Sequence, residues 1–163
     1  MHFEYLTGIS GEQGAAVLFN PAAEDPTKRC ILFLKPLNPE LDRWDGYRDE
    51  ISSSLRSRTG FTKVFRTNML SRELAAAARQ SRRLACLHPF AGHESPVSPD
   101  LALFRKVTER MIGVSIEDQT NLLPLMRASK SKAEIAMMRR AAEVTAAGYH
   151  SALMLIQPGV TER

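Results

Sequence analysis

The sequence predicts an α/β fold: a three-layer arrangement of a mixed β-sheet with flanking helices, ending in one long helix. Three apolar, strand-like runs come first, at residues 3–7, 15–19 and 30–34. Helical and strand-like patterns then alternate as far as residue 127. This order favours a mixed sheet that is covered by helices on its faces.

The first three runs are predicted to be consecutive strands. Residues 3–7 are aromatic or β-branched and stop at Gly8, so we expect a strand that turns there. Residues 15–19 are closed by Asn20-Pro21, and residues 30–34 read CILFL. The polar turn between these two runs predicts a hairpin, which requires antiparallel pairing.

The next elements follow from periodicity and from turn residues. Tyr47, Ile51 and Leu55 recur at steps of four, which predicts a helix within residues 41–58 that stops at Thr59-Gly60. Residues 61–65, 85–87 and 114–116 are predicted strands. The run of four alanines from residue 75 lies in a predicted helix that begins at Ser71.

Two further helical segments precede the long one. Ser98-Pro99-Asp100 has an N-cap residue followed by proline, which predicts the start of a helix over residues 100–111. Residues 120–127 predict one or two helical turns that Pro124 interrupts.

The long helix begins with a capping box. Ser131 is followed three residues later by Glu134, and Pro158-Gly159 provides the stop signal. Apolar residues then recur at steps of three and four, and we call them the apolar stripe: Ile135, Met138, Ala142, Ala146, Tyr149, Leu153 and Ile156. Twenty-six residues would make a rod of roughly 39 Å. We therefore expect something beyond this chain to lie against it.

Composition narrows the functional classes. The chain is 44% hydrophobic and 25% charged, the usual balance for a soluble domain. Its net charge is +4, but the basic residues are scattered and lack interleaved aromatics, so we expect no nucleic-acid partner. No run is long and apolar enough for a membrane span and the first residues do not resemble a signal peptide, so we expect a cytoplasmic protein without membrane contact. Cys30 and Cys86 are expected to be reduced thiols.

Two sequence motifs could suggest a metal site or a nucleotide site, but neither has the required spacing. His88, His93 and Glu94 lie close together in the sequence, but their spacing fits no common zinc pattern. The glycine series that starts at Gly8 is not the dinucleotide-binding fingerprint, and a strand follows it instead of a helix. We therefore predict neither a metal site nor a nucleotide site in this chain.

The segment from residue 126 to residue 162, MRASKSKAEIAMMRRAAEVTAAGYHSALMLIQPGVTE, resembles a junction found in Xaa-Pro aminopeptidases and prolidases. In that family, a creatinase-like amino-terminal domain is joined there to a metallopeptidase domain. The resemblance implies a domain over residues 1–129, and it makes residues 130–163 the first helix of a truncated "pita-bread" domain. It also implies that all five metal ligands, two Asp, one His and two Glu, would follow residue 163.

Two further segments carry the resemblance. Tyr5 to Gly8 reads YLTG, a family signature that we interpret as structural. Trp44, Gly46 and Arg48 match a W-x-G-x-R segment, which the resemblance places at a subunit interface that reaches the neighbouring protomer's substrate channel. The alternative for Trp44 is packing in the core. Family members also carry a strand and a helix before this signature, where this chain has four residues, so we expect an open strand edge.

The resemblance implies the activity of the whole family type. The full-length protein would be a homo-oligomeric metallopeptidase with two divalent ions, manganese in the usual case, that acts on peptides with proline in second position. This chain would be its non-catalytic portion, without a cofactor and inactive alone. Two alternatives stay open: a prolidase that cleaves Xaa-Pro dipeptides, and a non-catalytic creatinase-like domain that binds proteins.

Overall fold

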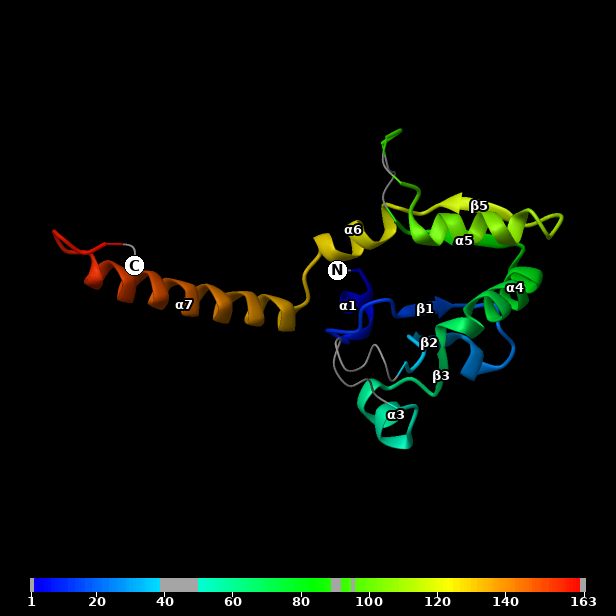
Figure 1. The fold of residues 1–163 in the computed structure, drawn as a ribbon, viewed down its shortest axis with the longest axis horizontal. Coiled ribbons are helices and arrows are strands. Elements are labelled where there is room, and N and C mark those ends of the chain that lie inside the picture. The colour runs from blue at the N-terminus through cyan, green and yellow to red at the C-terminus, as the bar shows by residue number, and fades with distance from the viewer. Residues whose placement is uncertain (1, 39–49, 89–91, 95, 162–163) are drawn as a thin grey trace. The chain divides into compact units, whose positions relative to one another are not determined.

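The structure is a computed structural model that describes residues 2–38, 50–88, 92–94 and 96–161 (Figure 1). The chain divides into two units, Met1–Asn121 and Leu122–Arg163, each of which is described by itself. A mixed sheet, a parallel sheet and flanking helices make up the first unit, and one long helix dominates the second. The predicted α/β class with a long terminal helix is therefore confirmed.

Three strands form the first sheet, in the order β1-β2-β3. β1 (Ala16–Phe19) is antiparallel to β2 (Cys30–Leu34), with Ala16 opposite Phe33, which confirms the predicted hairpin. β3 (Lys63–Arg66) runs parallel to β2. The central strand β2 is apolar at every position, and both Leu32 and Phe33 are completely buried because neighbouring strands and helices cover them.

The second sheet contains two parallel strands, β4 (Arg83–Cys86) and β5 (Ser115–Asp118). One sheet was predicted, whereas the described strands are divided between two. Side chains join the two sheets instead of a strand ladder. Leu18 of β1 packs on the cluster formed by Leu74, Ala78, Leu84 and Val107, to which β4 also belongs.

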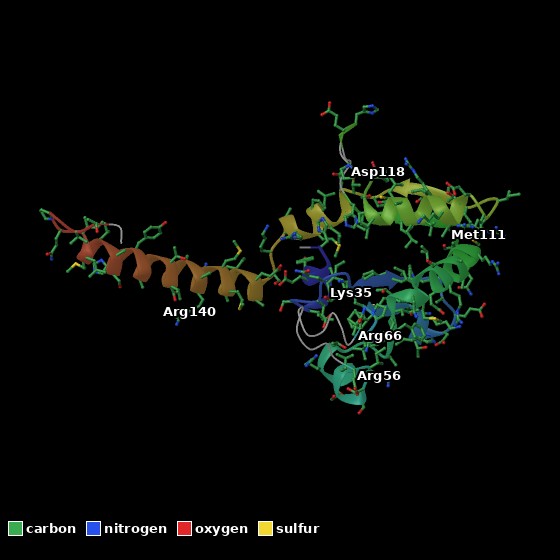
Figure 2. All side chains as sticks on the ribbon, viewed as in Figure 1. Lys35, Arg56, Arg66, Met111, Asp118 and Arg140 are labelled. Carbon is green, nitrogen blue, oxygen red and sulfur yellow. The ribbon has the colours of Figure 1, made fainter. Side chains whose placement is uncertain are left out.

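The helices of the first unit supply the rest of its core. They are α1 (His2–Thr7), α3 (Ser53–Thr59), α4 (Leu70–Ser81) and α5 (Pro99–Thr108), with short 3-10 turns η1 (Pro26–Lys28) and η2 (Thr67–Met69). A second cluster contains Leu32, Leu34, Leu55 and Val64, with Phe3 of α1 packed against it. Arg66 fixes the end of β3, because its Nη1 donates a hydrogen bond of 2.9 Å to the Lys35 carbonyl (Figure 2).

The predicted strand over residues 3–7 is wrong, because this run is the helix α1. The Gly8 N–H donates to the Glu4 carbonyl at 2.8 Å, and the Thr7 hydroxyl donates to the Phe3 carbonyl at 2.8 Å. Gly8 has φ +68°, the left-handed conformation that ends many helices. A short apolar run does not distinguish a strand from a buried helical turn by periodicity.

The helix predicted within residues 41–58 is shorter where it is described. α3 begins at Ser53, because the Ser52 hydroxyl accepts a hydrogen bond from the Leu55 N–H at 3.2 Å and so caps the helix. Residues 50–52 are not helical, and residues 39–49 lie outside the described residues. The stop at Gly60 is confirmed, since Gly60 has φ +75° and its N–H donates to Arg56.

The second unit contains α6 (Leu122–Ala128) and α7 (Lys132–Leu155). Pro124 does not interrupt α6: it lies in the first turn, where a backbone N–H has no partner within the helix. The capping box of α7 is confirmed in both halves, from Ser131 N–H to Glu134 at 2.8 Å and from Glu134 N–H to Ser131 at 3.2 Å. α7 ends at Leu155, earlier than predicted, because Ile156 is already extended. Among the described residues, no helix has the length and apolar character that crossing a membrane requires.

Candidate functional site

The site residues predicted from the sequence are only partly described. Tyr5 lies on α1 and is 37% exposed, and Gly8 follows the end of that helix. Trp44, Gly46 and Arg48 lie outside the described residues. The structure therefore places the YLTG signature and leaves the interface prediction untested.

The turn after α1 borders a cavity of about 380 Å³ in the first unit. Gly8 forms one side, and the Ile9 N–H donates to the Thr7 hydroxyl at 3.1 Å, which fixes the chain direction after the helix. Leu32 and Leu55 line the floor. The structural role that we predict for the YLTG signature stays a prediction.

A second cavity, of about 310 Å³, lies between the end of α1 and the start of β3. Its lining includes Thr7, Thr27, Cys30 and Gly60. Burial raises the pKa of the Cys30 thiol, which keeps the sulfur protonated and weakly nucleophilic at neutral pH. The Cys30 thiol is therefore not an activated nucleophile in this cavity.

A polar cluster surrounds Asp100 at the start of α5. The carboxylate accepts hydrogen bonds from His88 Nδ1 at 2.7 Å, from the His88 backbone N–H at 3.3 Å and from the Cys86 thiol at 3.5 Å. Its other oxygen accepts from the Leu101 N–H at 2.9 Å. The end of β4 and the first turn of α5 are thereby tied together at one side chain.

Electrostatics in this cluster favour the ionised carboxylate. Partial burial of Asp100 raises its pKa, but hydrogen bonds from Ser98 and His88 and the charge of His88 outweigh this effect, and the pKa falls to about 2. The N-terminus of α5 acts in the same direction. Burial and the Asp100 charge raise the pKa of the Cys86 thiol, so this sulfur is a structural donor.

Reasoning from the sequence missed the pairing of His88 with Asp100. It considered His88 beside His93 and Glu94, both of which are exposed on the loop. The available signal was an aspartate in the first turn of a helix, preceded in the sequence by a histidine that lies just beyond the end of a strand. The His2 ring meets the His88 ring edge-on at 6.5 Å, and His2 Nδ1 is buried without a hydrogen-bond partner among the described residues. No three or more His, Cys, Asp or Glu side chains are arranged to hold a metal ion in the described ranges.

Comparison with known proteins identifies the family. The family model described as "Aminopeptidase P, N-terminal domain" matches residues 1–85, which is more than half of the chain. No curated protein matches the chain. Solved structures of aminopeptidase P proteins are similar to it, and two of them are compared with it below. A point variant of Escherichia coli aminopeptidase P is 19% identical, with a TM-score of 0.75. Proline aminopeptidase P II from Yersinia pestis is 21% identical, with a TM-score of 0.73.

These similarities cover almost all of this chain but only part of the relatives. The chain is covered to 98% and 99%, and it spans 36% and 37% of the two matched chains. At such low identity the structural likeness establishes the fold, and the family match establishes the kinship. The chain belongs to the aminopeptidase P family, as its amino-terminal domain.

Proposed function

We propose that this chain is the non-catalytic amino-terminal portion of an Xaa-Pro aminopeptidase. The whole protein would hydrolyse the bond between the first residue of a peptide and a proline in second position. The observation that carries this proposal is the family match over residues 1–85. The fold likeness to two aminopeptidase P structures over nearly the whole chain supports it.

The described residues of this chain do not fit a metal centre. Among them, Asp100 is engaged by His88, Cys86 and the first turn of α5, and no three suitable side chains converge. We therefore assign no catalytic step to this chain. The two divalent ions that the proposal requires, manganese in the first instance, would be held by a domain beyond residue 163.

The proposed division places residues 1–129 in the amino-terminal domain and residues 130–163 at the start of the catalytic domain. The capping box at Ser131 supports this boundary, because it starts a new helix after a non-helical break at residues 129–131. The proposed location is the cytoplasm, which the free thiols of Cys30 and Cys86 support.

The proposed role of Trp44 and Arg48 is a contact with a neighbouring subunit near its substrate channel. Tryptophan and arginine are the residues most enriched among binding hot spots, which supports an interface at this segment. In a protein that carries the catalytic domain, Trp44→Ala should lower kcat/KM for longer Xaa-Pro peptides with little change in Tm. A large loss of Tm with normal kinetics for the folded fraction would instead indicate core packing.

The proposal is tested with two proteins. The 163-residue chain is incubated with Mn²⁺ and a peptide that has proline in second position, and release of the first residue is measured. A longer natural protein that includes this chain is assayed in parallel. We expect activity only in the longer protein, together with two Asp, one His and two Glu in its additional sequence.

Other outcomes select the alternatives. Release of the first residue by the 163-residue chain contradicts the proposal. A longer protein that cleaves dipeptides but not longer peptides is a prolidase. An inactive longer protein in which the ligand positions are altered is a binding protein, and the non-catalytic creatinase-like domain then replaces the enzyme.

A further inference from the structure

One side of β1 has no partner strand among the described residues. β1 pairs with β2, and the Asn20 N–H donates to the Arg29 carbonyl at 2.8 Å, so the alternation of the ladder makes Leu18 a residue that bonds to β2. Val17 and Phe19 therefore direct their N–H and C=O groups away from β2. No hydrogen bond within the described ranges reaches these groups. We call this side of β1 the open edge.

The sequence of β1 does not protect the open edge. Charged side chains and proline keep an edge strand from pairing with further strands, and β1 reads AVLF, without either. The other edge strands of the described sheets carry charges: Lys63 and Arg66 on β3, Arg83 on β4, Glu117 and Asp118 on β5. The composition of β1 therefore favours a second partner strand.

Apolar cores lie on both faces of the sheet beside β1. Val17 packs against the cluster that contains Leu32. Leu18 packs against the cluster that contains Leu74, because successive side chains of a strand point to opposite faces. A strand added beside β1 would lie between the same two cores. It would need apolar side chains at successive positions, as the central strand β2 has.

β4 also has a side without a partner strand in the described part of the chain. The Ser115 N–H donates to the Arg82 carbonyl at 3.0 Å, and the Gln119 N–H donates to the Cys86 carbonyl at 2.9 Å. Alternate residues of β4 therefore bond to β5, and Ala85 directs its backbone groups to the other side. No described residue bonds to the Ala85 backbone, so β4 offers a second ladder.

The helix α4 links the two sheets. The Asn20 side-chain amide, at the end of β1, donates to Gln80 Oε1 of α4 at 3.4 Å. Leu18 packs against the cluster that contains Leu74 of α4 and Leu84 of β4, so β1 and β4 border one core (Figure 1). One strand that bonds to both would join the two sheets into the single mixed sheet that the order of elements predicts.

We propose that an apolar strand from another part of the same polypeptide, outside residues 1–163, pairs with β1 at Val17 and Phe19 and with β4 at Ala85. The apolar runs of the described residues already lie in strands or helices. The chain spans 36% and 37% of the two relatives compared above, so most of a polypeptide of that kind lies outside this chain.

The two unpaired sides favour this source over a second copy. A second copy that pairs through its own open edge extends the sheet at β1 but leaves Ala85 of β4 without a partner. A strand that is buried on both faces is a permanent part of a core, and a separate partner would have to expose it whenever it is unbound. The inference shares with the proposed function only the premise of a longer polypeptide, and it needs neither a metal nor a peptide substrate.

The first experiment measures amide hydrogen exchange by NMR in the 163-residue chain. Val17, Phe19 and Ala85 should exchange at least about tenfold faster than Leu18 and Leu84, whose N–H groups lie in the ladders. These rates should not change across a dilution series. In a longer natural protein that includes this chain, the three fast amides should slow to the rates of their neighbours.

The second experiment removes single N–H groups of β1. Val17→Pro deletes an N–H that has no partner in the 163-residue chain, and edge strands tolerate proline at such positions. The Tm of this chain should fall by less than about 2 °C, and the Tm of the longer protein by more than about 4 °C. Leu18→Pro is the matched control: it breaks the ladder with β2 and should lower the Tm of both proteins.

Three results would overturn the proposal. Slow exchange of Val17, Phe19 and Ala85 in the dilute 163-residue chain would show that these groups are already paired. Protection that rises with concentration would identify a second copy as the partner. Fast exchange of the same amides in the longer protein would show that no strand is added, even if that protein is an active aminopeptidase. Protected amides in an inactive longer protein would support this inference and contradict only the proposed function.

Discussion

The first unit and α7 use apolar residues in opposite ways. In the first unit, Leu74 is 2% exposed and lies between α4, β4 and α5, so its burial is complete within one chain. In α7, Leu155 is 72% exposed, and the helix is held by its own backbone ladder and its capping box. Apolar content alone therefore does not indicate where a core is, because burial depends on what surrounds each side chain.

The largest expected difference in stability comes from replacing one leucine by alanine in each region. Leu74→Ala should lower the free energy of unfolding by about 2–5 kcal/mol, because it removes buried methyl groups and leaves a cavity. Leu155→Ala should change it by less than about 0.5 kcal/mol, since a surface side chain loses little. Urea unfolding of both variants measures the difference. Equal effects would contradict the contrast between the regions.

The free energy of unfolding of the first unit should depend on pH because of Asp100. Its folded pKa of about 2 lies below the ordinary value of 3.8, so the carboxylate stabilises the fold above pH 4. This contribution, up to about 2 kcal/mol, should be lost as the pH falls from about 4 towards 2.

Asp100→Asn should reduce stability at pH 7 and flatten the profile between pH 4 and pH 2, as measured by urea unfolding at several pH values. Glu143→Gln on α7 is the control, because Glu143 is exposed and pairs with Arg140 within its own helix. A profile of Asp100→Asn that matches the natural chain would show that the His88 contact does not stabilise the fold.

Replacing either of two glycines by alanine should change stability, but in opposite directions. Gly60 ends α3 with φ +75°, so Gly60→Ala should destabilise the first unit by about 1–2 kcal/mol. Gly148 lies inside α7 and an added Cβ would meet nothing within 4 Å, so Gly148→Ala should increase helicity. The gain is expected to be about 1 kcal/mol. Unfolding curves test the first change, and circular dichroism at 222 nm tests the second.

The smallest expected effect concerns the capping box. Ser131→Ala should cost α7 about 1 kcal/mol, because the Glu134 N–H loses its acceptor. Hydrogen exchange at the first turn of α7 should become faster, while exchange in β2 should stay unchanged. Faster exchange in both would mean that α7 and the first unit unfold together.

The sequence predicted elements well wherever a local signal was unambiguous. The capping box at Ser131, the stop at Gly60 and the hairpin between β1 and β2 depend on a few adjacent residues, and all three are present. The helix α1 was mistaken for a strand, because five residues are too few to show a period.

Features that depend on distant residues were beyond the sequence. The division of the strands between two sheets depends on packing between Leu18 and the cluster around Leu74. The contact between His88 and Asp100 joins residues twelve positions apart across a loop whose path was not predictable. The predicted interface at Trp44 and Arg48 stays a prediction.

The parallel strand pairs have a consequence for the speed of folding. β2 pairs with β3 from Ile31 to Lys63, and β4 pairs with β5 from Arg83 to Ser115, so each ladder closes over thirty-two residues. Contacts between residues so far apart in sequence form late, because closing the loop costs conformational entropy before the ladder's hydrogen bonds can offset that cost. A helix such as α7 forms through neighbouring residues in about a microsecond. We expect α7 to be helical, with its stripe exposed, before either parallel ladder has closed.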